Sequence, residues 1–105
     1  MSEHNIKTWP EYFQAVLDGT KTFEVRKDDR GYQVGDILVL QEWWPPEEVD
    51  GQWTIGFGTG RECRRTVTYV LHGPTFGIED GYVVMGIQRD VGDYKAHYDD
   101  PTLYF

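Results

Sequence analysis

The chain has 105 residues, a formal net charge of −8 and an aromatic share of 15%. This length predicts one domain with a single modest core, which a few large aromatic side chains can fill. The negative charge excludes indiscriminate binding to duplex nucleic acid, because that binding depends on a basic footprint. A single cysteine, Cys63, excludes an internal disulfide and any multi-cysteine metal site.

The beginning of the chain predicts a short strand followed by a helix. Residues 6–8 are the strand candidate, and Pro10 followed by Glu11 is typical of a helix start. Apolar residues then recur at helical spacing and predict one apolar face, made of Trp9, Phe13, Val16 and Leu17. Gly19 is placed to end the helix as the residue after its C-cap.

Residues 22–26 predict a second strand, in which apolar and polar residues alternate. We expect Phe23 and Val25 to face the core. The opposite face carries the polar members of the segment, Thr22, Glu24 and Arg26. Lys21 stands where the strand begins, so this face is expected to build a charged site.

Several strands are predicted beyond a polar turn at residues 27–31. In chain order they are residues 37–43, 53–55, 61–72 and 82–88. Alternation along residues 61–72 predicts one shared face for Val67, Tyr69 and Leu71. The first of them is apolar on both faces at its start, which is typical of a central strand. The glycine-rich residues 56–60 predict a turn. This order of elements predicts an α+β fold, a small bent β-barrel of about five to six strands with a helix after the first strand.

Basic residues occur in two runs, and acidic residues occur elsewhere. The first run holds Lys21, Arg26, Lys27 and Arg30, and the second holds Arg61, Arg64 and Arg65. If the two runs meet in space, the protein has a positive face on a negative body. The alternative is that the outer members of each run are ordinary solvated charges.

The two ends of the sequence indicate the binding partners and the cellular location that we expect for the protein. Residues 92–105 are both acidic and aromatic, so this tail is expected to fold back on the barrel or to bind a protein partner. The start shows no basic segment followed by an apolar one, and no apolar run approaches the length of a membrane span. We therefore expect a cytoplasmic protein without a membrane partner.

The segment from Gly19 to Arg26 resembles the Gly-x-Lys-x-x-Glu-x-Arg signature of ASCH domains, which belong to the PUA-like superfamily of small pseudo-barrels. Further blocks resemble a small uncharacterised bacterial and phage subgroup of the DUF3850 type. They lie at residues 4–7, 10–13, 21–30, 34–42, 67–71 and 77–87. The resemblance implies a PUA-like domain over residues 1–91, followed by the tail over residues 92–105.

In these domains the signature residues line a cleft that faces RNA or a nucleotide-like ligand, which implies roles for Lys21, Glu24 and Arg26. Lys21 supplies a point charge for phosphate, and Arg26 offers a planar fork of donors. Glu24 can accept a hydrogen bond from an exocyclic amine or act as a general base. Thr22 lies on the same strand face, and Arg30 and Arg65 are expected nearby. The structural alternative is that Glu24 and Arg26 simply pair across the strand while Lys21 is solvated.

Three functions stay open at this point. The first is a module that binds single-stranded RNA or a nucleotide-like small molecule. The second is a hydrolase acting on nucleic acid or a modified nucleoside, with Glu24 as general base and Lys21 or Arg26 stabilising developing charge. The third is a phage or accessory protein that binds another protein.

One branch of the superfamily resembles amidohydrolases that remove the acetyl group of N4-acetylcytidine with a threonine nucleophile. In this chain Glu24 stands at that position, which argues against the activity and leaves catalytic residues unassigned. No cofactor is expected, and no metal site either, because His4 and His72 lack suitable companions.

Three tryptophans are candidates for stacking against unpaired bases: Trp43, Trp44 and Trp53. The alternative is that they pack against the protein itself, and we favour this for Trp43.

Overall fold

The computed structural model describes residues 1–89, and in this part of the chain one helix and seven strands follow one another. The elements are β1 (Glu3–Thr8), α1 (Pro10–Leu17), β2 (Phe23–Lys27), β3 (Ile37–Trp44), β4 (Glu48–Val49), β5 (Gln52–Trp53), β6 (Phe57–His72) and β7 (Tyr82–Arg89). Most predicted elements are present, with bounds shifted by a few residues. The predicted tail, residues 92–105, lies outside the described residues.

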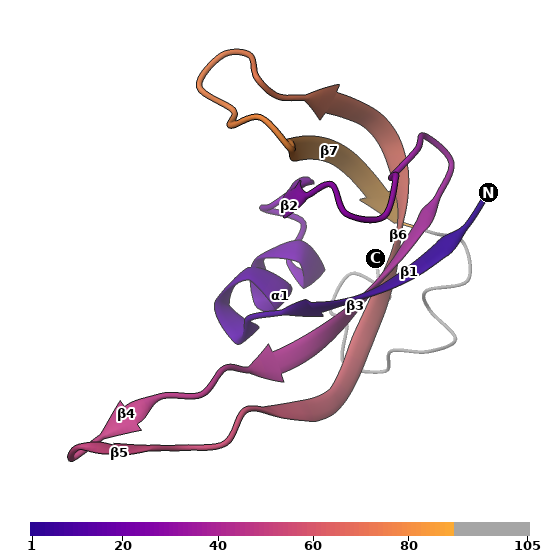
Figure 1. Cartoon of the computed structure of the whole chain (residues 1–105). Coiled ribbons are helices and arrows are strands. Elements are labelled where there is room, and N and C mark those ends of the chain that lie inside the picture. Colours follow the sequence, from indigo (N-terminus) through magenta and orange to yellow (C-terminus); the bar gives the residue numbers. More distant parts are fainter. Residues whose placement is uncertain (90–105) are drawn as a thin grey trace.

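Five strands form one sheet in the order β1-β3-β6-β7-β2. β1 pairs with β3 in parallel, and the other pairs are antiparallel. The sheet curls around α1 into a half-barrel, and the short β4–β5 hairpin projects from the far ends of β3 and β6 (Figure 1). The prediction of a small barrel-like sheet with a helix after the first strand is therefore confirmed, although the helix has only 8 residues.

Helix α1 forms as its apolar spacing predicts. Phe13, Val16 and Leu17 are buried. Gly19 ends the helix at a φ of 80°, and its N–H donates to the carbonyl of Val16 at 3.1 Å. Trp9 was expected on the same apolar face, but it is 54% exposed. It is the N-cap residue with extended backbone, so its side chain does not follow the helical face.

The core lies between α1 and the concave face of the sheet. Its members are Ile6, Phe13, Val16, Leu17, Tyr32, Leu38, Leu40, Cys63, Val67, Val83, Met85 and Ile87. Every strand of the main sheet except β2 contributes an apolar side chain to this cluster. β2 is therefore the exception, and the residue that it places on the concave face belongs to the candidate site.

The turn predicted at residues 56–60 is wrong. The ladder between β3 and β6 continues there, and Trp43 pairs with Gly58. A Cβ atom at Gly56 would lie 2.6 Å from Cζ2 of Trp43, closer than real contacts allow. The glycine at this position permits the chain to pass against an indole ring and does not mark a turn.

The face assignment of the second half of β6 is also wrong. The alternation predicted one shared face for Val67 and Tyr69, but a register shift separates these two residues. A bulge inserts one extra residue and so reverses the side on which later residues point. As a result Val67 is in the core and Tyr69 is exposed.

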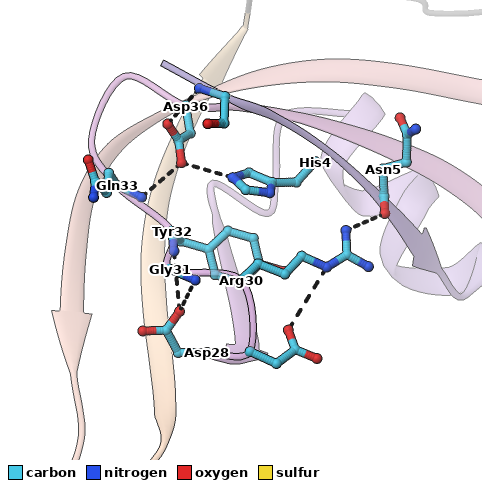
Figure 2. Close-up of polar contacts among 10 residues, drawn as sticks. His4, Asn5, Asp28, Arg30, Gly31, Tyr32, Gln33 and Asp36 are labelled. Carbon is cyan, nitrogen blue, oxygen red and sulfur yellow. Dashed lines mark hydrogen bonds and ion pairs between the residues drawn. The ribbon is translucent and has the colours of Figure 1, made fainter.

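The polar segment before β3 is fixed by two aspartates (Figure 2). Asp28 accepts hydrogen bonds from the N–H groups of Gly31 and Tyr32, at 3.1 and 3.2 Å. Asp36 accepts from the N–H of Ser2 at 3.0 Å, from Nε2 of His4 at 2.9 Å and from the N–H of Gln33 at 3.0 Å. Asp36 thereby joins the beginning of β1 to the turn that leads into β3.

The environment of Asp36 shifts its acidity. Burial of the carboxyl acts to raise its pKa, but the hydrogen bonds from His4, Ser2 and Gln33 outweigh this and hold the pKa below the ordinary value of 3.8. Because the pKa is lower in the folded state, the carboxylate contributes stability above the unfolded-state pKa. That stability is lost as the pH falls through the folded-state pKa.

We expect Asp36→Asn to lower the free energy of unfolding by about 1–3 kcal/mol at neutral pH, because three donors lose a charged acceptor. The difference between wild type and variant should shrink as the pH falls below the unfolded-state pKa of about 4, and it should disappear below the lower folded-state pKa, where the native carboxylate is protonated too. Urea titrations at neutral and acid pH measure both values. Asp50→Asn is the matched control, since Asp50 is exposed at a φ of 52°, which asparagine tolerates. An Asp36→Asn difference that does not change with pH would contradict this account.

Candidate functional site

Strand β2 turns its acidic residue, and not its apolar residues, toward the core side. Glu24 pairs with Met85 in the register with β7, and Met85 belongs to the core. Directly opposed residues of an antiparallel pair point to the same face, so Glu24 faces the concave side. Phe23 and Val25 are 45% and 51% exposed. The predicted alternation is confirmed, but the assignment of Phe23 and Val25 to the core is wrong.

Glu24 is 2% exposed and is held between two cations. Its Oε1 accepts from Nζ of Lys21 at 2.6 Å, and its Oε2 accepts from Nε of Arg26 at 3.1 Å. Lys21 also donates to the carbonyl of Phe23 at 2.8 Å. Arg26 reaches across to β1, where its Nη2 donates to Oγ1 of Thr8 at 3.2 Å. The pairing of Glu24 with Arg26 is therefore present, and Lys21 joins it instead of being solvated.

This ion-pair cluster keeps capacity for a ligand. An ammonium group has three donors and a guanidinium group has five, while an ionised carboxylate has about four acceptor positions. Among the described residues, Lys21 and Arg26 each use two donors, and the oxygens of Glu24 accept one hydrogen bond each. A bound molecule can therefore form hydrogen bonds without breaking those that position the three side chains.

The cluster lies in a cleft of about 520 Å³ between β1, the start of α1 and β2. The lining residues are Lys7, Thr8, Trp9, Tyr12, Lys21, Phe23, Glu24, Val25 and Arg26. This volume falls within the range of small-molecule sites, which is about 300–1,000 Å³. The cleft thus combines a charged cluster with an exposed aromatic wall.

Sequence reasoning missed the aromatic wall. The rings of Trp9 and Tyr12 are stacked, with centroids 6.1 Å apart and an angle of 22° between planes. Nζ of Lys21 lies 5.0 Å from the ring centroid of Phe23 and 5.8 Å from that of Tyr12, within cation–π range. The signal available in the sequence was Tyr12, an aromatic residue that does not fit the apolar spacing of the helix.

The remaining residues of the predicted site lie elsewhere. Arg30 lines a groove of about 440 Å³ that adjoins the cleft and shares Arg26 with it. Thr22 and Arg65 line a third hollow, of about 170 Å³ near the end of α1, which shares Lys21 with the cleft. Arg65 is buried there and donates to the carbonyl of Val16 at 3.3 Å. The structure therefore brings Lys21, Glu24 and Arg26 together, with Arg30 beside them, and places Thr22 and Arg65 outside the cleft.

The three candidate stacking tryptophans also lie outside this cleft. Trp43 is half-buried, with Nζ of Lys7 at 4.0 Å from its ring centroid. Trp44 stacks on Phe57 with centroids 6.4 Å apart, and Trp53 is exposed on the β4–β5 hairpin. These positions agree with packing against the protein for Trp43 and Trp44.

Two further observations hold for residues 1–89. No group of three or more histidine, cysteine, aspartate or glutamate side chains in this range is arranged to hold a metal ion. None of the helices in the same range is long and apolar enough to cross a membrane.

Comparisons with known proteins confirm the predicted resemblance to the DUF3850 type. The family model described as "Domain of unknown function (DUF3850)" matches residues 3–87, which include the whole cleft. A protein of Escherichia phage P2, described as "Uncharacterized 12.9 kDa protein in GpA 3'region", is 39% identical over 67 residues. The match covers 64% of this chain and 52% of the phage protein, so the chain spans about half the length of this relative.

We expect Glu24→Gln to lower the free energy of unfolding by about 1–3 kcal/mol, because two cations lose the carboxylate between them. Chemical denaturation followed by circular dichroism measures this change. Glu48→Gln is the control, since Glu48 is exposed on β4 and its loss should change the stability by less than about 0.5 kcal/mol. Equal stability of wild type and Glu24→Gln would show that the ion pairs contribute nothing to the fold.

Proposed function

The chain belongs to the DUF3850 family, and we propose that it binds a nucleotide or a short single-stranded RNA in the cleft between β1, α1 and β2. The observation that carries this proposal is the position of Glu24, buried between Lys21 and Arg26 beside an exposed aromatic wall. Each part of that arrangement matches one part of a nucleotide.

The aromatic wall is suited to a base. Unpaired bases stack on aromatic side chains, and each such contact contributes about 1–3 kcal/mol. Trp9, Tyr12 and Phe23 line the cleft and are all partly exposed, so part of each ring is accessible to a ligand. This contact is tolerant of sequence, because every base has a π face.

The charged cluster is suited to the polar parts of a nucleotide. The remaining donors of Lys21 and Arg26 can bind phosphate or a base edge, and Glu24 can accept from an exocyclic amine. The ligand is small, because the protein as a whole carries a charge of −8 and would repel a long polyanion. We place this activity in the cytoplasm, where RNA and nucleotides are available.

We further assign the half-barrel to the ASCH domains of the PUA-like superfamily. The support is the signature spacing of Lys21, Glu24 and Arg26, together with their convergence at one cleft beside β2. Fold resemblance alone does not identify a function, since proteins of one fold have many different activities. The proposal therefore depends on the cleft itself.

Binding accounts for the geometry of Glu24 better than hydrolysis does. A general base loses its negative charge when it removes a proton, whereas a hydrogen-bond acceptor keeps its charge and therefore its ion pairs. Both oxygens of Glu24 already accept hydrogen bonds from cations, at 2.6 and 3.1 Å. This arrangement fixes the carboxylate in place as an acceptor, which suits recognition.

We expect Trp9→Ala to weaken the binding of cytidine 5′-monophosphate by about tenfold, because the base loses a stacking surface worth about 1–3 kcal/mol. NMR titration of labelled protein measures the affinity and also shows whether the fold is intact. Trp53→Ala is the matched control, since this tryptophan is exposed on the β4–β5 hairpin, away from the cleft.

Three results would count against the proposal. Absence of saturable shifts at Lys21, Glu24 and Arg26 would exclude a nucleotide-binding cleft. Equal loss of affinity in Trp9→Ala and Trp53→Ala would exclude stacking at this wall. A new product in the same samples, abolished by Glu24→Gln, would identify a hydrolase instead.

A further inference from the structure

A second groove continues the cleft along the open side of the half-barrel. It has a volume of about 440 Å³ and shares Lys7 and Arg26 with the cleft, so the two hollows are adjacent. Its lining residues are Asn5, Ile6, Lys7, Arg26, Lys27, Asp29, Arg30, Tyr32 and Gln41. Apart from the two shared residues, none of these belongs to the aromatic cleft.

The two hollows differ in chemistry. The cleft has an aromatic wall, whereas the groove is lined by four cationic side chains, those of Lys7, Arg26, Lys27 and Arg30. Its single lining carboxylate, Asp29, lies 3.9 Å from Nε of Arg30, and both side chains are exposed, so this pair is weak. The groove therefore has an excess of positive charge.

Arg30 is held in place for binding. Its Nη1 donates to the carbonyl of Asn5 on β1 at 2.7 Å, so the guanidinium spans from the turn after β2 to the opposite edge of the sheet (Figure 2). One donor fixes the position of the planar group, and the other donors are available to a ligand. Preorganisation of this kind reduces the entropy lost on binding.

Tyr32 adds a buried donor to the groove. Its ring packs edge-on against His4, with centroids 4.9 Å apart, and the residue is only 4% exposed. Its hydroxyl makes no hydrogen bond with any residue in the range 1–89. A buried hydroxyl without a partner is unfavourable, so native structures satisfy most such groups.

The protonation state of Tyr32 suits a donor role. Burial raises the pKa of its hydroxyl above the ordinary value of 10.0, and the nearby Arg30 and Arg26 only partly oppose this rise. The hydroxyl therefore keeps its proton at neutral pH. Tyr32, Arg30 and Arg26 all line this groove.

We propose that this groove is a phosphate subsite, in which Arg30, Arg26 and the hydroxyl of Tyr32 bind a phosphate group of the ligand whose base occupies the aromatic cleft. This inference rests on the proposed function and narrows it to phosphorylated ligands. The phosphate is either the terminal group of a mononucleotide or the group that links two nucleotides. Both sources present the same charged oxygens to the groove.

The test compares four ligands that all contain cytosine as their base. Cytidine, cytidine 5′-monophosphate, cytidine 3′-monophosphate and the dinucleotide CpC are titrated into the full chain at one fixed salt concentration. We expect at least one phosphorylated ligand to bind about tenfold or more tightly than cytidine, because charge-assisted hydrogen bonds are strong. The ligand that gains most identifies the source of the phosphate.

Two variants test the residues. Tyr32→Phe keeps the ring that packs on His4 and removes only the hydroxyl, so the variant should fold. It should reduce severalfold the gain from phosphate, which is the ratio of the affinity for the phosphorylated ligand to the affinity for cytidine. Arg30→Gln should reduce the same gain about tenfold. Neither change should alter the affinity for cytidine. Arg64→Ala is the control for charge, since Arg64 pairs with Glu3 and does not line the groove.

The outcomes separate the two proposals. Equal affinities for cytidine and all phosphorylated ligands would overturn the phosphate subsite and leave the nucleotide-binding cleft standing. A gain from phosphate that Tyr32→Phe and Arg64→Ala reduce equally would also overturn the subsite. Absence of binding by all four ligands would overturn both the subsite and the proposed function.

Discussion

The curled sheet stays open between its two edge strands, β1 and β2. This opening, the seam, places the side chains that line both the cleft and the groove. No backbone hydrogen bond joins β1 to β2 in the described part of the chain. The seam is bridged instead by side chains: Arg26 donates to Thr8, and Arg30 donates to the carbonyl of Asn5. Unpaired edges usually invite aggregation, and cationic residues protect against it. Here the same cations line the cleft and the groove, so protection of the edges and formation of the site have one structural cause.

Placing a carboxylate on the core side of β2 has a physical consequence for recognition. A buried ion pair adds little net stability, but removal of one partner is strongly unfavourable, so the members of the cluster hold one another in fixed positions. Glu24 orients the donors of Lys21 and Arg26 before any ligand arrives. Sites fixed in this way lose little entropy on binding. With one carboxylate between two cations, the cluster also keeps a net positive charge.

Local patterns in the sequence predicted the helix and most strands, because helical spacing and strand alternation depend on neighbouring residues alone. The rule that apolar residues face the core failed at Phe23 and Val25. The face of β2 is set by its register with β7, a contact between residues distant in the sequence. Glycine-rich residues 56–60 predicted a turn for a similar reason, since the approach of Trp43 to Gly56 is invisible locally. The sequence indicated Lys21, Glu24, Arg26 and Arg30, but it could not show that Tyr32 lines the groove beside Arg30 or that Arg65 lies outside the cleft.

The length of the seam limits the ligand. β2 has 5 residues, which span about 17 Å at the usual rise of a strand. A stretch of this length has room for a mononucleotide or a short oligonucleotide and not for a long strand. Beyond it the protein is acidic, with Glu47, Glu48 and Asp50 on the projecting hairpin. A short cationic seam on a negatively charged body would attract a small phosphorylated ligand and repel a long one, so the charge of −8 is compatible with the proposed nucleotide site.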